Sequence, residues 1–177
     1  ASELFGVELS QWQNEKGVDN DAYRAYVRDL TGGDKSEAKR VTKAALKAMY
    51  DTTQEWFAAK NITHVRLYRG ASMTGVDDLA PSTVVSFDDS VLASWSSQWS
   101  IGLRFLQMGS RLEGKSGVLL GAVIPVERIF SVPLAGLGSV AEYEFVVLGS
   151  NEPAHARLLY NERWKVSRSE SAAKAWL

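Results

Sequence analysis

Hydrophobic and polar residues are spaced in two different ways along the chain, and the change falls near Ile62. Before Ile62, apolar side chains recur at the three- and four-residue intervals of an amphipathic helix. This spacing predicts one helix over Asp21–Leu30 and a second from Asp34, a typical N-cap residue, to about Lys60. The apolar stripe expected to face the core on the second helix is Ala38, Val41, Ala45, Ala48, Met49, Thr52 and Trp56.

After Ile62 the pattern becomes that of short strands, with alternating or apolar runs bounded by turn residues. The expected strands are Thr63–Arg69, Val84–Phe87, Gly117–Ile124, Arg128–Val132, Tyr143–Leu148 and Arg157–Trp164. One further helix is expected from about Ser97, its N-cap, to Met108. Helices followed by strands predict an α+β fold with a mixed or antiparallel sheet, in a single domain of residues 1–177. Residues 1–61 form its helical part and residues 62–168 its β-rich part.

Composition narrows the chemistry that the chain can perform. It has no Cys and 2 His among 177 residues, which excludes disulfides and thiol nucleophiles and argues against a metal centre. Lys and Arg total 20 against 21 for Asp and Glu, a net charge of -1 that argues against non-specific binding to duplex nucleic acid. A local basic patch stays compatible with this balance. The longest apolar run, Val118–Val126, is too short for a membrane helix, so we expect no membrane insertion.

Glu142 and Glu144 flank Tyr143 at the start of an expected strand. Because strand side chains alternate between faces, both glutamates are predicted to point the same way. A solvated strand face would explain such a pair. Glu is nevertheless a poor strand former, and two like charges so close repel each other unless a function uses them.

Arg69 is expected to end a strand, followed by Gly70. A guanidinium offers a planar fork for phosphate, and glycine lets a ligand approach the backbone; a surface ion pair is the alternative for Arg69. Ser94 and Ser96 lie at the end of another short strand, before the helix expected at Ser97. Their hydroxyls could cap that helix or orient a carboxylate.

Residues Gly136–Ala141 fit the letters of a dinucleotide-binding fingerprint. That fingerprint requires a helix directly after it, whereas the residues that follow here are predicted to form a strand. We therefore expect no Rossmann site. The glycines are better explained by a loop that approaches a ligand or moves.

Taken in order, a strand-borne Arg69 is followed about 25 residues later by Ser94, and Glu142 follows roughly 50 residues after the serine. With these motifs the chain resembles the ADP-ribosyltransferases of the Arg–Ser–Glu class, which include bacterial arginine-modifying toxins, vertebrate ecto-enzymes and phage relatives. The resemblance covers about Ile62 to Trp164. It implies N-terminal helices packed on a mixed or antiparallel β-sandwich core of the ADP-ribosyltransferase type. The matching segments are Val65–Gly70, Leu92–Ser97 and Ala141–Leu148.

The resemblance implies NAD as a co-substrate that is cleaved, without a metal. By its match to the family, Glu144 is the catalytic glutamate, and Ser94 orients it. Arg69 matches the arginine that holds the pyrophosphate and ribose, and Gly70 would meet the nicotinamide amide through its backbone. The second hydroxyl of the motif, Ser96, also carries over to the binding site. Residue chemistry agrees, because a carboxylate stabilises the positive charge that develops on the ribose as the glycosidic bond breaks.

In this family Glu-x-Glu usually accompanies arginine acceptors, so the expected activity is mono-ADP-ribosylation of arginine on a target protein. Glu142 would take the proton that the acceptor guanidinium loses as it attacks. The loop Pro133–Ala141 would help to recognise the acceptor, with Gly136 and Gly138 making it mobile.

The chain departs from the family pattern at Trp95, which stands where a threonine is usual. Phe105 and Arg104 are candidates for the aromatic and the cation near nicotinamide and phosphate, although core packing would also explain Phe105.

Three other functions stay open: modification of RNA or DNA bases, hydrolysis of NAD alone, and a silent binding module that keeps the fold. A start without Met and a chain without Cys fit a domain of a larger bacterial toxin. Such a toxin would be secreted or delivered from the producing cell, would act in the target-cell cytoplasm, and would have a cognate immunity protein. A phage or regulatory enzyme would look the same.

Overall fold

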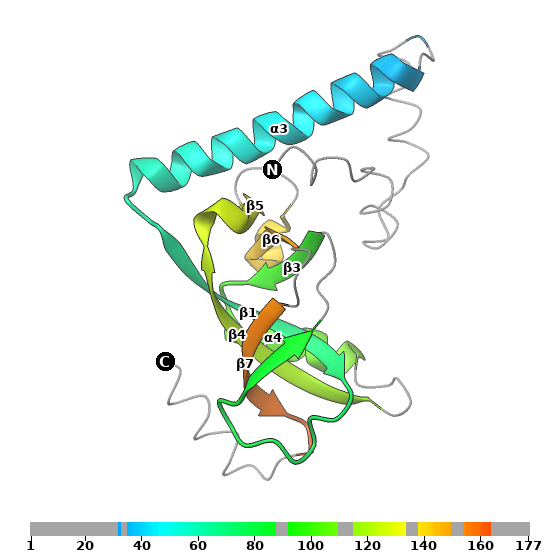
Figure 1. The fold of residues 1–177 in the computed structure, drawn as a ribbon, viewed down its shortest axis with the longest axis vertical. Coiled ribbons are helices and arrows are strands. Elements are labelled where there is room, and N and C mark those ends of the chain that lie inside the picture. Colours follow the sequence, from blue (N-terminus) through cyan, green and yellow to red (C-terminus); the bar gives the residue numbers. More distant parts are fainter. Residues whose placement is uncertain are drawn as a thin grey trace.

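A computed structural model describes residue 32 and residues 35–87, 92–109, 115–133, 138–149 and 154–163. Within these ranges the fold is α+β, as expected, with a long helix α3 (Lys35–Ala59), a shorter helix α4 (Trp99–Gly109) and seven strands (Figure 1). Helix α3 closely matches the helix predicted from Asp34 to Lys60. The helix expected over Asp21–Leu30 lies outside the described residues.

The described strands form one sheet in the order β2-β7-β4-β1-β3-β6-β5, and every neighbouring pair is antiparallel. The expectation of a mixed or antiparallel sheet is thus met by the antiparallel form. Two single-turn 3₁₀ helices, η2 (Val126–Arg128) and η3 (Val140–Glu142), precede β5 and β6. The strands are β1 (His64–Met73), β2 (Val84–Phe87), β3 (Leu92–Ser96), β4 (Ser116–Pro125), β5 (Ile129–Ser131), β6 (Glu144–Leu148) and β7 (Ala154–Asn161).

The sheet bends at the junction between β1 and β3. Strand β1 pairs with β4 along its whole length, but with β3 it pairs at Tyr68 and Ser96 alone. The apolar side chains of both halves then enter the same buried cluster, which includes Leu67 and Leu158 from one half and Val147 from the other. Two groups of strands, β2-β7-β4-β1 and β3-β6-β5, therefore cover one core, and their junction lies beside the site described below.

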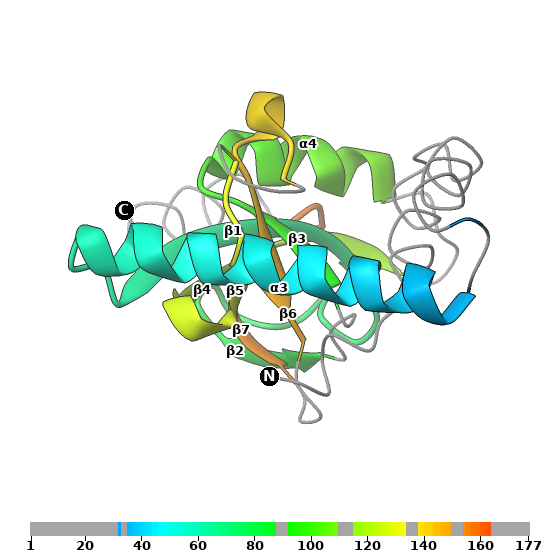
Figure 2. The ribbon, with the colours of Figure 1, turned by 90° about the horizontal axis from the view of Figure 1, so that it is seen from above.

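Helix α3 packs against β5 and η2, and Figure 2 shows it lying across the strands. Its buried side chains are Leu46, Thr53 and Phe57. The Gln54 amide donates hydrogen bonds to the carbonyl oxygens of Val126 (3.0 Å) and Ile129 (2.9 Å). The Tyr50 hydroxyl donates to the carbonyl of Glu127, and burial of this side chain raises its pKa. These contacts fix the helix to the end of the sheet that carries β5.

The apolar stripe predicted for this helix is wrong by about one residue from Ala45 onward, although Ala38 and Val41 are half-buried and Met49 packs against the core. Ala45, Ala48 and Thr52 are exposed, and Trp56 is 37% exposed. Alanine and threonine gain little from burial, so the larger Leu46 and Phe57, one position further along, decide how the helix is rotated.

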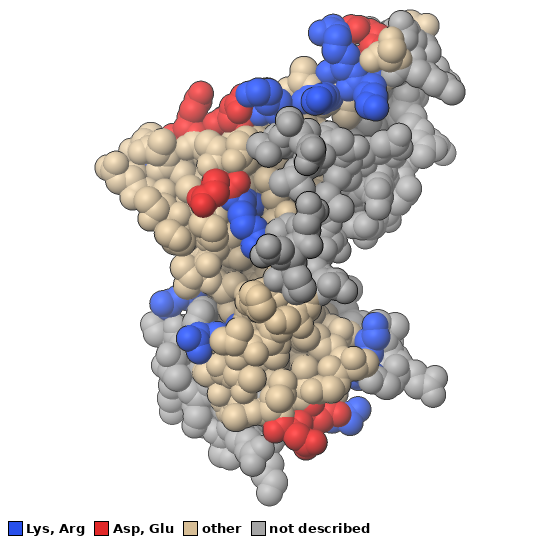
Figure 3. Space-filling view, in the orientation of Figure 1, with Lys and Arg blue, Asp and Glu red and all other residues tan. Residues whose placement is uncertain are grey.

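Charged side chains on the face shown in Figure 3 gather along α3. Its first half is mainly basic, with Glu37 paired to Arg40, and its second half carries acidic residues. The residues are Lys39, Arg40, Lys43 and Lys47 in the first half and Asp51 and Glu55 in the second. The near-neutral chain thus has a basic stretch on one half of one helix.

Helix α4 lies directly on β1 and β4, where Tyr68, Leu106 and Leu119 form a separate buried cluster with Leu159. The helix lies close to the strand because the residue of β1 that faces it, Gly70, has no side chain. A Cβ added to Gly70 would lie 2.2 Å from the Gly102 carbonyl oxygen and 2.4 Å from the Leu106 nitrogen. Since backbone atoms cannot yield as a side chain can, Gly70 is what allows α4 to reach the strand.

Candidate active site

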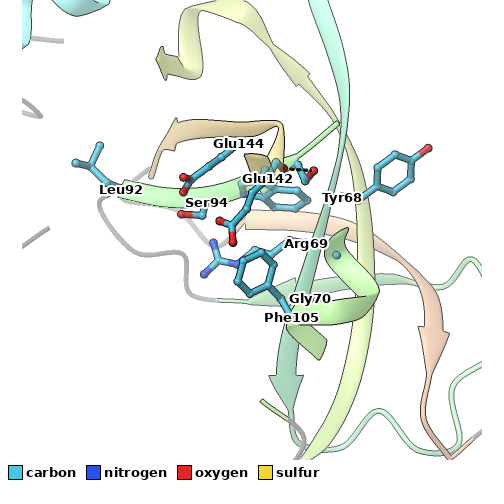
Figure 4. Close-up of a pocket in the computed structure, with 11 residues that line it drawn as sticks. Tyr68, Arg69, Gly70, Leu92, Ser94, Phe105, Glu142 and Glu144 are labelled. Atoms are coloured by element: carbon cyan, nitrogen blue, oxygen red, sulfur yellow. Dashed lines mark hydrogen bonds between the residues drawn. The ribbon is translucent and has the colours of Figure 1, made fainter. Parts of the chain in front are cut away.

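A cavity of about 300 Å³ opens where β1, β3, α4 and the start of β6 meet. This volume is at the lower end of the range of small-molecule sites. Every candidate residue from the sequence except Arg104 contributes to its wall, and Figure 4 shows Arg69, Ser94, Glu142 and Glu144 gathered around the same space. The lining residues are Tyr68, Arg69, Gly70, Leu92, Ser94, Trp95, Ser96, Gly102, Phe105, Glu142 and Glu144.

Arg69 lies in the interior of β1, not at the end of a strand as the sequence suggested. Pairing with β4 continues past it, from Gly70 opposite Leu119 to Met73 opposite Ser116. Arg69 follows Leu67 by two positions, so it lies on the face of β1 that covers the core. Its guanidinium leaves that core at the β1–β3 junction and extends into the cavity (Figure 4).

The two serines of β3 lie on one face of the strand but have different surroundings. Ser94 is half-buried and points into the cavity (Figure 4). Ser96 is buried, and its hydroxyl donates to the Glu142 carbonyl (2.8 Å) and accepts from the Gln98 amide (3.0 Å). Ser96 therefore joins η3 to the beginning of α4, while Ser94 faces the cavity.

The predicted N-cap Ser97 is not where α4 begins. The first carbonyl to accept helical hydrogen bonds is that of Gln98, bonded by the amides of Ile101 and Gly102. Ser97 instead donates its amide to the Tyr143 carbonyl. The hydroxyl that accepts a hydrogen bond from the Gln98 amide is that of Ser96, one residue before the predicted N-cap.

Trp95 points away from its serine neighbours, into the core, although part of it also contributes to the cavity wall. It is 3% exposed and packs against Phe87 with ring centroids 6.4 Å apart. Its indole nitrogen has no hydrogen-bond partner within the described part of the chain. Trp95 thus contributes apolar surface to the cavity wall but no hydroxyl group.

Glu144 is the first residue of β6 and is 6% exposed, which is unusual for a carboxylate. Its Oε2 accepts a hydrogen bond from the Ser139 amide at 2.8 Å. The chain before it passes so close that a Cβ on Gly138 would lie 2.3 Å from the Glu144 carbonyl oxygen. The sequence suggested that Gly138 makes a loop mobile; the structure gives it a packing role beside Glu144, and Gly136 lies outside the described residues.

The prediction that Glu142 and Glu144 share a strand face is wrong. Glu142 belongs to η3, and Tyr143 has a left-handed backbone with φ 49°. This conformation is uncommon for a residue other than glycine and was not predictable from an alternating pattern. The turn nevertheless brings both carboxylates to the wall of the cavity.

Phe105 and Arg104 lie on the side of α4 next to Glu142. Phe105 lines the cavity and is 37% exposed, so the alternative that it belongs to the core is wrong. Arg104 stacks over the Phe105 ring, 5.7 Å from its centroid, and its Nη2 donates to Glu142 Oε1 at 3.0 Å. Arg104 thus lies beside the cavity through an ion pair rather than in its wall.

Sequence reasoning missed Tyr68, Leu92 and Gly102, which also line the cavity. Tyr68 and Leu92 lie within the matching segments but were given no role, so closeness to Arg69 and Ser94 was the available signal. No sequence signal pointed to Gly102, because its role depends on a contact with a residue distant in sequence. A Cβ at this position would lie 2.5 Å from the Leu119 Cδ1.

The residues Gly136–Ala141 do not form a Rossmann site. Their described part leads into η3 and then directly into β6, so no α-helix follows at which a pyrophosphate could bind. The strand predicted after this segment is confirmed, except that it begins at Glu144.

Wider comparisons add no assignment to this cavity. Against family models, curated proteins and solved structures, the chain has no match. Within the described residues, no cluster of three or more His, Cys, Asp or Glu could hold a metal ion. Neither described helix is long and apolar enough to cross a membrane. The polar and aromatic groups that line the cavity are two carboxylates, a guanidinium, hydroxyls and the rings of Tyr68, Trp95 and Phe105.

Proposed function

We propose that this chain is a mono-ADP-ribosyltransferase that cleaves NAD, releases nicotinamide and transfers ADP-ribose to an arginine of a target protein. The supporting observation is that Arg69, Ser94 and Glu144 meet in one cavity from three different strands. The core does not need polar side chains at these positions. Charged and hydroxyl groups gathered in a cavity instead mark a candidate functional site.

Glu144 would act on the ribose next to nicotinamide. As the bond between ribose and nicotinamide breaks, positive charge develops on the ribose, as in glycoside hydrolysis. A buried carboxylate interacts with that charge more strongly than one in water does. The amide of Ser139 helps to offset the cost of burying Glu144 and holds its side chain in one orientation.

Arg69, Ser94 and Phe105 would bind the rest of NAD. The Arg69 guanidinium suits a pyrophosphate because it donates several hydrogen bonds in one plane. The Ser94 hydroxyl can orient Glu144 or the ribose, and the exposed Phe105 ring offers a flat apolar surface for nicotinamide. The expected contact of the Gly70 backbone with the nicotinamide amide stays a prediction.

Glu142 would serve the acceptor. A guanidinium must lose a proton as it attacks, and a carboxylate at the cavity mouth can take it. The Glu142 side chain is 29% exposed and accepts a hydrogen bond from a guanidinium, that of Arg104. This contact favours arginine as the acceptor.

Nicotinamide release from NAD tests the proposal. Glu144→Gln keeps the shape of the side chain but removes its charge, and we expect the rate to fall by about 100-fold or more. Glu55→Gln, an exposed substitution on α3, is the matched control and should leave the rate unchanged. Equal rates for wild type and Glu144→Gln would contradict the proposal.

The acceptor class needs a separate experiment. NAD labelled in its adenosine part is incubated with a cell lysate and the active chain, and the products are then digested with protease or nuclease. We expect the label to be released by protease. Release by nuclease would indicate a nucleic-acid acceptor, and free ADP-ribose without labelled macromolecule would indicate an NAD glycohydrolase.

A further inference from the structure

The Glu142 carboxylate, proposed to take a proton from the acceptor arginine, already binds a guanidinium of the same chain, that of Arg104. Arg104 on α4 and Glu142 in η3 are 38 residues apart in sequence, and the Arg104 Nη2 lies 3.0 Å from Glu142 Oε1. Phe105, the neighbour of Arg104, lines the cavity, so the pair lies at the cavity's edge. An incoming arginine would compete with Arg104 for this carboxylate.

This ion pair contributes little to folding. The Arg104 side chain is 56% exposed and that of Glu142 is 29% exposed, and solvent screens the attraction between charges in such surroundings. The pair therefore opens readily, and the long Arg104 side chain can turn within the mouth of the cavity.

We propose that Arg104 is itself an acceptor, so that the chain ADP-ribosylates its own Arg104. This inference rests on the proposed function. A guanidinium nitrogen of Arg104 forms a bond to C1′ of the ribose, and the C1′–nitrogen bond to nicotinamide breaks. The electron pair of that bond leaves with nicotinamide, which becomes neutral, and Glu142 takes the proton that Arg104 loses.

Several other described arginines have hydrogen-bond partners that do not line the cavity; Arg157, for example, donates to the carbonyl of Ser82. Arg40 bonds to Glu37 on α3, and Arg128 bonds to the carbonyl of Leu148. Arg163 bonds to Asp77. The same Asp77 accepts a hydrogen bond from Ser116, the first residue of β4. Arg69 does line the cavity, but it is assigned to the pyrophosphate. The position of Arg104 therefore predicts modification at one site rather than at many exposed arginines.

The test incubates the purified chain with NAD and maps ADP-ribose by peptide mass spectrometry, with nicotinamide release and labelling of agmatine, a small guanidine, measured in parallel. We expect the peptide that contains Arg104 to gain one ADP-ribose. The fraction modified per unit time should not depend on protein concentration, because donor site and acceptor belong to one molecule. Arg104→Lys should lose this label, whereas Arg163→Lys, an exposed arginine outside the cavity, should keep it.

The outcomes separate this inference from the proposed function. Nicotinamide release and agmatine labelling without modification of Arg104 would overturn the inference and leave the function standing. Modification spread evenly over exposed arginines, or a rate proportional to protein concentration, would also overturn it. If no nicotinamide were released, the proposed function would fail and the inference with it.

Discussion

At the scale of single residues, the two glutamates of the cavity have different surroundings, and those surroundings indicate different tasks. Glu144 is buried and held by a backbone amide, whereas Glu142 is part-exposed and holds a guanidinium. A fixed, desolvated carboxylate suits the stabilisation of charge on a bound substrate. An accessible carboxylate suits the removal of a proton from a group that arrives from solution.

Glu142→Gln should therefore separate transfer from cleavage. We expect ADP-ribose transfer to agmatine to fall by about 100-fold, because the amide cannot accept the guanidinium proton. NAD hydrolysis to free ADP-ribose should fall much less, since Glu144 remains. Both products can be measured in one reaction by chromatography; equal losses of the two would argue against a base that serves the acceptor alone.

Gly138 lets the chain before η3 pass close to the backbone of Glu144. In Gly138→Ala the new Cβ would lie 2.3 Å from the Glu144 carbonyl oxygen, so the backbone must shift and carry the Ser139 amide away from the Glu144 carboxylate. We expect nicotinamide release to slow by about tenfold, the equivalent of about 1.4 kcal/mol. Steady-state kinetics check this, and an unchanged rate would show that the Ser139 hydrogen bond does not matter for cleavage.

At the scale of elements, α4 connects the cavity to the sheet. It carries Arg104 and Phe105 and lies on β1 through close glycine contacts. Gly70 and Gly102 lie in the same contact, but the atoms they face differ. A Cβ on Gly70 meets backbone, whereas a Cβ on Gly102 meets the end of the Leu119 side chain, which can change its rotamer.

This difference predicts a graded effect on stability. Gly70→Ala should lower the free energy of unfolding by about 1–3 kcal/mol, as overpacking does. Gly102→Ala should cost less, because Leu119 can move and because alanine is favoured over glycine in a helix by about 1 kcal/mol. Urea denaturation of both variants measures this order, and a larger loss for Gly102→Ala would contradict the packing described.

Sequence reasoning succeeded where local chemistry decides the structure. An N-cap followed by periodic apolar residues located α3, and turn residues located most strands. It failed where a contact distant in sequence decides. Arg69 lies within β1 because β4 pairs beyond it, and the rotation of α3 depends on what Leu46 and Phe57 meet in the core.

The same distinction applies to the site. The sequence identified Arg69, Ser94 and Glu144 by their order and type, and these three do lie together. Conformations around the cavity were less predictable: the left-handed Tyr143 removes Glu142 from the strand, and two hydrogen bonds engage the Ser96 hydroxyl with η3 and with the residue before α4. Such details depend on loop geometry, which residue type constrains only weakly.

At the scale of the whole molecule, the cavity lies where the pairing between strands β1 and β3 nearly stops. One residue pair, Tyr68 and Ser96, connects β1 to β3, and beyond it the two strands separate. Arg69 on β1 and Ser94 on β3 both lie on the same side of this pair, and β6, the neighbour of β3, adds Glu144. The strand order that produces this arrangement is set by long-range pairing and could not be deduced from the chain alone.

The most direct test of the central claim is a crystal structure of the Glu144→Gln variant bound to NAD, since slow cleavage should keep the substrate intact. We expect the pyrophosphate to contact Arg69, nicotinamide to lie against Phe105, and the adjoining ribose to be within hydrogen-bond distance of residue 144. NAD bound elsewhere, or oriented with adenine toward residue 144, would contradict the account.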